Sequence, residues 1–550
     1  MSFKLPIHYC SKKTTFSNLY DDLELLEKGN MYKYLFKPST ILGEQMLKQW
    51  SEFYTTDTAF LKDSQYLYDS LDNTNVDKEC TEQMWKMWNN IKKEDNFLEK
   101  YQYIDWSKLK WLNKYTPFLS FISLYNLISP LLNLILPIVM LIIPFFLLKI
   151  MRIPITFSSY KKILLEQIRN HSVGQFFTQF KHVEWDKRVY ILVSLGIYLF
   201  NIYQNIVSCC RFYLNMKTIN TYFTLMEKYI KYTVQKMNIV IQKASQLSTY
   251  KPFITNMLAY KSKLIELAIQ LPKNHNVSPK SLLKIGKTMK IFYLLYSEDN
   301  YNDLLSYSFD FNGYWDTIVG LHKNKSVHNA SFNGSNVSFK NTFYPSLNKP
   351  IKNDISFKKN IIITGPNASG KTTLLKCCVL NLLFTQQVGK GFYDKAKIKP
   401  FDYIHCYLNI PDTSSRDSLF QAEARRCKEI LNFIELFPNK KHFCIFDELY
   451  SGTNPYEAIG SAYSYLKFIS KNKRVRFMLT THFIQLCSLF EKEKNIINWK
   501  MKPSRVGEKI IHSYKIVRGI SKIRGGICVL KELHYPIKIL KETESIIRTL

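Results

Sequence analysis

The pattern of apolar and polar positions divides the chain into a helical first part and a mixed second part. Residues 16–110 and 212–320 place apolar side chains three and four positions apart and contain few glycines or prolines, which predicts helices. The stretch from Phe223 to Leu247 predicts one long amphipathic helix. Such a helix usually acts as a lever or packs against its neighbours. From about Ala330, short β-rich runs alternate with helical runs. This alternation predicts a mainly parallel α/β sheet and a domain boundary near residue 330.

Two uncharged runs interrupt the helical part. The first extends for 34 residues from Tyr115 to Leu148, and the second extends from Val189 to Cys210. A helix crosses a bilayer with about 20 apolar residues, so each run is long enough for one span. We predict two hydrophobic membrane segments, at about 117–148 and 189–210. The alternative is a pair of buried helices in a large helical core, because both runs contain polar amide side chains.

The sequence does not determine how these two segments are oriented in a membrane. The first run contains four prolines, which predict a kinked helix or a re-entrant hairpin. Residues 149–188 hold eight Lys or Arg and three Asp or Glu, a net charge of +5, and the outer flanks are basic as well. The positive-inside rule therefore does not separate the two sides, and a shallow insertion from the cytosolic side is also possible. The prolines are Pro117, Pro130, Pro137 and Pro144.

Length, charge and cysteine content narrow the class of protein. A chain of 550 residues is too long for one core and suggests about three or four structural units. Its formal charge of +32 suits a nucleic-acid or anionic-membrane partner, although an AT-rich coding sequence rich in lysine codons gives the same excess. Eleven scattered cysteines without zinc-site spacing indicate a reduced, intracellular compartment. Residues 1–10 lack the apolar core of a secretory signal.

A phosphate-binding motif begins the mixed part. Residues 360–373 read NIIITGPNASGKTT, a buried strand, a glycine-rich loop and a helix start with a complete GxxxxGK[ST] pattern. Backbone N–H groups at such a helix start can wrap the phosphates of ATP. We expect Lys371 to neutralise the β and γ oxygens and Thr372 to take a Mg²⁺ position. The candidate nucleotide-binding residues are Gly365, Pro366, Asn367, Ala368, Ser369, Gly370, Lys371, Thr372 and Thr373.

Two further apolar strands end in polar groups. One apolar strand ends at two carboxylates, Asp447 and Glu448. Asp447 would hold Mg²⁺ through water, and Glu448 would act as general base on the attacking water. The strand from Arg476 ends at His482, which could contact the γ-phosphate or the lytic water, although a lone histidine is more often structural. These motifs predict ATP hydrolysis with Mg²⁺ as cofactor.

The motifs GPNxSGKTT, FDELYSGTNP (446–455) and TTHF (480–483) resemble the ATPase domain of the MutS family of DNA mismatch repair proteins. The resemblance implies an α/β P-loop NTPase fold, a homodimer with ATP at composite sites, and DNA binding. Residues 412–426 resemble the family's signature loop, which implies that Ser418 reaches the γ-phosphate bound by the opposite subunit. Arg416 replaces the usual glycine two positions before that serine. Residues 514–526 and 533–536 also resemble the family's closing strand and helix, and a weaker similarity at 22–26 and 34–50 extends the resemblance to the start of the helical core.

Three departures from the family pattern qualify this resemblance. The chain begins near the helical core, without room for the domain that inserts a Phe beside a Glu into mismatched DNA, and Phe97-Leu-Glu99 matches that pattern only by coincidence. Membrane segments are foreign to the repair proteins, although shorter membrane-inserted relatives exist. An aromatic residue that would stack on adenine is not evident, and Ile351 is a weak candidate near Tyr344.

The sequence therefore predicts four domains and leaves two roles open. They are a first helical core part at 1–114, a membrane insert at 115–211, a helical core and lever domain at 212–329, and a MutS-type ATPase domain at 330–550. One role is a DNA-binding ATPase of mismatch repair or recombination; the other is a membrane-anchored mechanical ATPase without mismatch recognition. The ATPase domain is expected on the cytosolic side. An ABC transporter subunit fits less well, because the DELYSGTNP and TTH motifs follow the MutS pattern.

Overall fold

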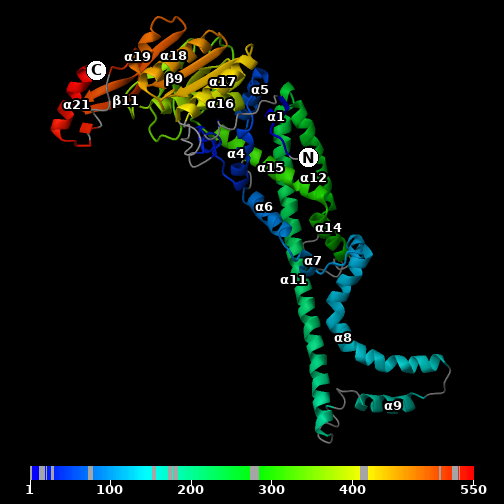
Figure 1. Ribbon diagram of the computed structural model, residues 1–550. Coiled ribbons are helices and arrows are strands. Elements are labelled where there is room, and N and C mark those ends of the chain that lie inside the picture. The colour runs from blue at the N-terminus through cyan, green and yellow to red at the C-terminus, as the bar shows by residue number, and fades with distance from the viewer. Residues whose placement is uncertain are drawn as a thin grey trace. The chain divides into compact units, whose positions relative to one another are not determined.

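The chain forms two compact units in a computed structural model (Figure 1). One comprises Met1–Val76, Gln235–Tyr260 and Tyr307–Leu550, and the other comprises Asp77–Val234 and Lys261–Ser306. Three helices contribute residues to both units: α11 (Trp185–Ala244), α12 (Lys251–Gln270) and α15 (Asp299–Lys323). The structure describes residues 3–10, 19, 22–26, 30–71, 78–151, 156–170, 176, 184–272, 284–408, 419–506, 509–522, 530–531 and 533–549.

The unit built from Asp77–Val234 and Lys261–Ser306 is helical in its described residues. Its core is aromatic: Phe97 is fully buried and stacks on Tyr296 at a ring distance of 3.8 Å. Phe97 is therefore a packing residue, in agreement with the interpretation of Phe97-Leu-Glu99 as a coincidence. Besides parts of α11, α12 and α15, the unit contains α6 (Lys78–Lys92), α7 (Phe97–Lys100), η1 (Lys110–Lys114), α8 (Thr116–Ile150), α9 (Phe157–Asn170) and α14 (Ile285–Ser297).

The two uncharged runs lie on two long helices. The first run forms α8, which changes direction along its length (Figure 1). It contains prolines beyond its first turn, and each of these removes a backbone hydrogen bond. The second run and most of the predicted amphipathic helix lie on one continuous helix, α11, of 60 residues. Thr116–Ile135 and α11 are the stretches, among the described residues, long and apolar enough to cross a membrane by length and composition.

The first segment of the other unit packs around one buried helix of the mixed part. Helix α16 (Lys371–Val388) is buried along most of its length, so its polar side chains need internal partners. Gln387 supplies an example: its Nε2 donates to the carbonyl oxygens of Trp50 and Phe53, and its Oε1 accepts from the Tyr32 hydroxyl. The helices of this first segment are α1 (Ile7–Cys10), α3 (Met31–Phe36), α4 (Ile41–Ser51) and α5 (Thr58–Asp69), with η2 (Ser248–Tyr250) from a later segment.

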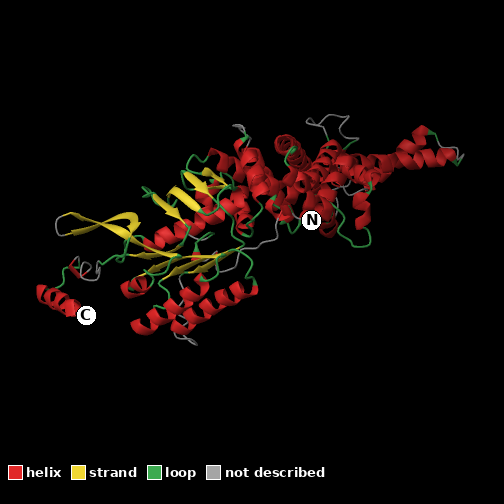
Figure 2. Cartoon of the chain, turned by 90° about the horizontal axis from the view of Figure 1, so that it is seen from above, coloured by secondary structure: helices red, strands yellow, loops and turns green. Residues whose placement is uncertain are grey.

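A six-stranded sheet forms the centre of the mixed part, in the order β11-β10-β4-β9-β8-β7. Five strands are parallel and β11 pairs antiparallel with β10, so the predicted mainly parallel sheet is present (Figure 2). Parallel strands need crossover connections, and helices supply them. The strands are β4 (Asn360–Thr364), β7 (Tyr403–Tyr407), β8 (His442–Asp447), β9 (Val475–Thr481), β10 (Ile496–Val506) and β11 (Lys509–Arg518).

A second sheet of five short strands was not predicted from the sequence. Its order is β3-β2-β6-β1-β5, and it mixes parallel and antiparallel pairs. The strands have two to five residues, which is too short for an alternating pattern to identify them. They are β1 (His328–Ser331), β2 (Ser338–Thr342), β3 (Asn353–Ser356), β5 (Lys390–Gly391) and β6 (Lys395–Lys397).

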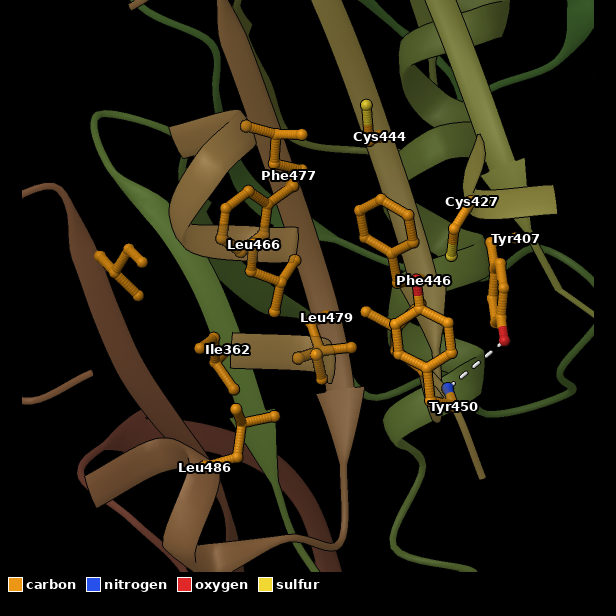
Figure 3. Close-up of a cluster of buried hydrophobic side chains, with 14 of the residues drawn as sticks. Ile362, Tyr407, Cys427, Cys444, Phe446, Tyr450, Leu466, Phe477, Leu479 and Leu486 are labelled. Carbon is orange, nitrogen blue, oxygen red and sulfur yellow. Dashed lines mark hydrogen bonds between the residues drawn. The ribbon is translucent and has the colours of Figure 1, made fainter. Parts of the chain in front are cut away.

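Three helices cover one face of the six-stranded sheet and enclose a hydrophobic core (Figure 3). Phe446 of β8 lies at its centre, where its ring meets those of Tyr407, Tyr465 and Phe477. The covering helices are α17 (Leu419–Leu436), α18 (Pro455–Ser470) and α19 (Ile484–Leu489). Helix α21 (Ile537–Thr549) follows the closing strands near the C-terminus.

Replacing Phe446 by alanine is expected to destabilise the sheet. Phe446 is fully buried, so the substitution loses the transfer free energy of the ring and leaves a cavity, together about 3–5 kcal/mol. The measurement is urea unfolding followed by tryptophan fluorescence. Phe468→Ala is the matched control, because Phe468 of α18 is 53% exposed and its loss is expected to change stability little. Equal destabilisation by the two variants would contradict this description of the core.

Candidate nucleotide site

The predicted site residues lie at the carboxyl edge of the parallel sheet. Strand β4 leads into the glycine-rich loop, β8 ends at Asp447, and β9 ends at Thr481, next to His482. Strand β9 lies between β4 and β8, so the three strand ends are neighbours. This is the edge at which open α/β sheets bind ligands. The structure therefore brings together the three motifs, which are spread over residues 365–482 of the sequence.

Side chains pack closely against the glycines of the glycine-rich loop. A Cβ on Gly365 would lie 2.8 Å from the Ser369 Oγ and 3.0 Å from the Met501 side chain, so a larger residue does not fit. Gly370 has a φ of +90° and precedes the first turn of α16, and Ala368 also has a positive φ of 57°. This conformation turns the chain into the helix start, where free N–H groups and the helix dipole favour an anion.

The side chain of Lys371 lies in the loop and reaches the end of β9. Its Nζ is 3.2 Å from the Pro366 carbonyl oxygen and 3.1 Å from His482 Nε2. The same His482 nitrogen lies 2.8 Å from Glu448 Oε1. A ring nitrogen carries either a proton or a lone pair, so His482 bonds the carboxylate or the ammonium group, one at a time. A phosphate oxygen that attracts Lys371 would leave His482 free to bond Glu448.

The two acidic residues have different environments. The Asp447 carboxylate accepts a short hydrogen bond from the Thr480 hydroxyl of the adjacent strand. Glu448 has a positive φ of 51°, and its backbone N–H donates to the Thr480 carbonyl oxygen at 3.0 Å. Asp447 is therefore bound to the neighbouring strand, whereas Glu448 bonds His482.

Burial and hydrogen bonding shift two pKa values at the site. The hydrogen bond with His482 lowers the pKa of Glu448 below its ordinary value of 4.5, with the Lys371 charge contributing less. Burial lowers the pKa of Lys371, and the charges of Glu448 and Asp447 oppose that shift. Glu448 is therefore ionised at neutral pH, as a base must be.

A cavity of about 580 Å³ opens beside the loop. Of the predicted nucleotide-binding residues, Asn367 to Thr373 line it, as does Glu448, whereas Gly365 and Pro366 lie at the beginning of the loop. Thr372 lies in the first turn of α16 at the cavity wall. The Ser369 hydroxyl oxygen is buried and has no hydrogen-bond partner among the described residues. Asp447 and His482 are not among the lining residues, although His482 contacts the lining residues Lys371 and Glu448. The loop donors and the Glu448 carboxylate fit phosphate oxygens and a hydrated Mg²⁺.

Aromatic and aliphatic residues also line the cavity: Phe343, Tyr344, Leu347, Ile351 and Tyr514. The sequence offered Ile351 as a weak candidate for stacking on adenine but missed Tyr514, which comes from β11. Tyr514 is 46% exposed and has a φ of 54°, and its ring lies against Gly370. Its carbonyl oxygen accepts a hydrogen bond of 2.9 Å from Asn353, which fixes it to β3.

The loop after Glu448 is fixed to α17 by one buried carboxylate. Glu423 accepts hydrogen bonds from the N–H groups of Ser451 and Gly452 and from the Ser451 hydroxyl, at 3.0 to 3.2 Å. This contact connects the predicted signature region with the acidic motif. Ser418 itself lies outside the described residues, so its predicted contact across a dimer stays a prediction.

Comparison with known proteins agrees with this geometry. Residues 361–550 match the family model of MutS domain V. The chain is 30% identical over 206 residues to the DNA mismatch repair protein MutS of Prochlorococcus marinus (strain AS9601), covering 37% of this chain and 22% of the relative. For the MutS protein of Finegoldia magna the identity is 31% over 205 residues, with shares of 36% and 22%. The alignments thus span about a fifth of the length of these relatives.

Proposed function

We propose that this chain, which belongs to the MutS family through its domain V at residues 361–550, binds and hydrolyses ATP. The observation that carries the proposal is the meeting of Lys371, Glu448 and His482 at one edge of the sheet, beside a cavity that fits a nucleotide. The reaction is phosphoryl transfer to water, for which positioning and charge stabilisation supply most of the rate.

Each site residue has a role in this proposal. The N–H groups of the glycine-rich loop and the Lys371 ammonium group bind the phosphates. Thr372 and Asp447 would hold Mg²⁺, which neutralises charge on the phosphate oxygens when it is bound. Glu448 accepts a proton from the attacking water, and His482 orients that carboxylate through its hydrogen bond of 2.8 Å. The aromatic side of the cavity, with Tyr514, offers a surface for the adenine ring.

The active form in this proposal is a homodimer joined through the ATPase domain. Ser418 of one subunit would complete the site of the other, which makes hydrolysis depend on assembly. Each hydrolysis event would open or close the dimer and move the helices of residues 212–320. The partner that receives this motion is DNA or a membrane insert.

DNA is the partner favoured by the named relatives, which are DNA mismatch repair proteins. The formal charge of +32 supports this partner, because Lys and Arg release counterions from nucleic-acid phosphates. Repair or recombination of DNA is the role that follows. Mismatch recognition is not part of this proposal.

A membrane anchor is supported by the surfaces of α8 and α11. Large apolar side chains are exposed along both helices, including Phe121, Leu131, Phe146, Val193 and Phe200. Basic and aromatic residues flank them, with Arg188 over the Trp185 ring at 5.6 Å. Exposed apolar side chains of this number are costly in water and favourable in lipid. We therefore propose membrane insertion through 117–148 and 189–210, with the ATPase domain on the cytosolic side.

The two partners are distinguished by one pair of measurements on the full chain. A DNA-binding ATPase is expected to hydrolyse ATP faster when mismatched, branched or homoduplex DNA is added, with binding that weakens steeply as salt increases. A mechanical membrane ATPase is expected to be indifferent to DNA and to stay in the membrane fraction after washing with carbonate. Extraction by carbonate would contradict the membrane anchor, and unchanged turnover with every DNA would contradict a DNA-driven enzyme.

A further inference from the structure

The edge of the sheet opposite the nucleotide site is basic. Each of the five parallel strands begins within a few residues of a lysine or arginine. In spatial order these residues are Lys494 before β10, Lys359 before β4, Arg474 before β9, Lys441 before β8 and Lys399 before β7. We call these five residues the basic edge. All belong to the same compact unit, and all but the half-buried Lys441 are exposed.

The sheet register places neighbouring members of the basic edge side by side. Val475 pairs with His442, so Arg474 and Lys441 are adjacent, and the His442 N–H donates to the Arg474 carbonyl oxygen at 3.0 Å. Asn360 pairs with Ile496 and donates to the Asn495 carbonyl oxygen at 2.9 Å, which brings the segments of Lys359 and Lys494 together. Four strand spacings of about 4.8 Å make the row roughly 19 Å long.

Most positive charges of this edge have no ion-pair partner within the described part of the chain, and Asp402 lies beside it, where its carboxylate accepts a hydrogen bond of 3.0 Å from the Lys441 backbone N–H. Three of the strands carry a second cation one position earlier, at Lys358, Lys440 and Lys473. Lys440 reaches Asp402 at 3.9 Å, and no other member of these pairs or of the basic edge forms an ion pair among the described residues. Like charges held this close repel one another, so an anionic partner bound along the edge would remove that repulsion.

The length and composition of the basic edge indicate which kind of anionic partner it binds. A nucleic-acid strand carries about one phosphate per 3.4 Å of duplex axis, so roughly 19 Å corresponds to about five phosphates. A peripheral membrane site binds more tightly when large apolar side chains beside its cations enter the lipid. The residues next to the basic edge, Phe357, Phe401, Phe443, Val475 and Ile496, are buried instead. The edge therefore offers cations in a line without apolar anchors.

We infer that the basic edge binds the phosphate backbone of a nucleic acid, away from the ATP site and independently of base sequence. This inference rests on the DNA binding proposed above and assigns a surface to it. Phosphate contacts without base contacts give affinity and orientation but no sequence preference. Binding at the amino edge leaves the carboxyl edge of the same sheet open to nucleotide.

The test compares two fourfold charge reversals in the full, detergent-solubilised chain. The edge variant carries Lys359→Glu, Lys399→Glu, Lys441→Glu and Arg474→Glu. The control variant carries Lys325→Glu, Lys340→Glu, Lys428→Glu and Lys538→Glu, four exposed residues away from the edge with the same change in net charge. Binding of a 20-base-pair duplex is measured by fluorescence anisotropy over a salt series, and ATP binding checks the folding of each variant.

The edge variant is expected to bind the duplex at least about a hundredfold more weakly, with a salt slope smaller by about 3 to 4, since each lost phosphate contact removes about 0.9. The control variant is expected to keep the wild-type slope. Equal duplex binding by the edge variant and the wild type would overturn the inference while leaving DNA binding intact. A wild type that binds no duplex would overturn both. Wild-type binding only to vesicles of phosphatidylcholine with one-third phosphatidylserine would overturn the nucleic-acid assignment.

Discussion

Replacing Lys371 by alanine is expected to weaken ATP binding at least about a hundredfold, because charge-assisted hydrogen bonds contribute about 1.5–3 kcal/mol each and Lys371 can make more than one. Lys371 lies within the glycine-rich loop, where burial strengthens its attraction to a phosphate. The measurement is equilibrium binding of a fluorescent ATP analogue, with Mg²⁺ present, to the full chain.

Lys325→Ala is the control for this substitution. Lys325 is an exposed lysine of the same compact unit and does not line the cavity, so its loss is expected to leave ATP affinity unchanged. The alanine variant at 371 also removes the contact with His482, which frees that ring to bond Glu448. Undiminished ATP binding by the Lys371 variant would show that the phosphates lie elsewhere.

Replacing Glu448 by glutamine is expected to reduce ATP turnover at least about a hundredfold while ATP binding is retained, as for the loss of a general base. Glutamine keeps the size of the side chain and a hydrogen bond to His482 but does not accept the proton of the attacking water. Steady-state phosphate release and equilibrium ATP binding, measured on the same preparation, separate the two effects.

Glu457→Gln is the matched control for the general base. Glu457 lies in the first turn of α18 and accepts a hydrogen bond of 2.8 Å from Thr453, outside the cavity. The direction of the Glu448 pKa shift adds a pH prediction. Because the folded-state pKa lies below 4.5, the base form of Glu448 is expected to be lost only as the pH falls below that value. Wild-type turnover in Glu448→Gln would refute the assigned role.

The sequence predicted the parts of the site that follow directly from a strand. The loop around Lys371, the acidic pair after β8 and His482 after β9 each come at the end of an apolar run, and parallel strands place such ends at one edge. A phosphate-binding pattern also specifies its own geometry, because the glycines and the helix start are local. That these three motifs meet at one edge of the sheet could therefore be predicted without knowing the fold of the remaining chain.

The parts of the site that depend on pairing between distant segments were not predicted. The Thr480 hydroxyl meets Asp447 only because β8 and β9 pair in one register, and Tyr514 reaches Gly370 through the last strand of the sheet. The short strands of the second sheet have too few residues for a periodic signal. The single helix α11 was divided in the prediction because its composition changes from apolar to amphipathic along its length.

The most direct test is whether the purified full chain binds ATP at a stoichiometry of one per subunit. The arrangement of Lys371, Glu448 and the cavity predicts saturable binding in the presence of Mg²⁺ that is lost in the Lys371→Ala variant. Isothermal titration calorimetry measures both stoichiometry and affinity. Absence of any binding at millimolar ATP by a folded wild-type chain would contradict the ATPase assignment.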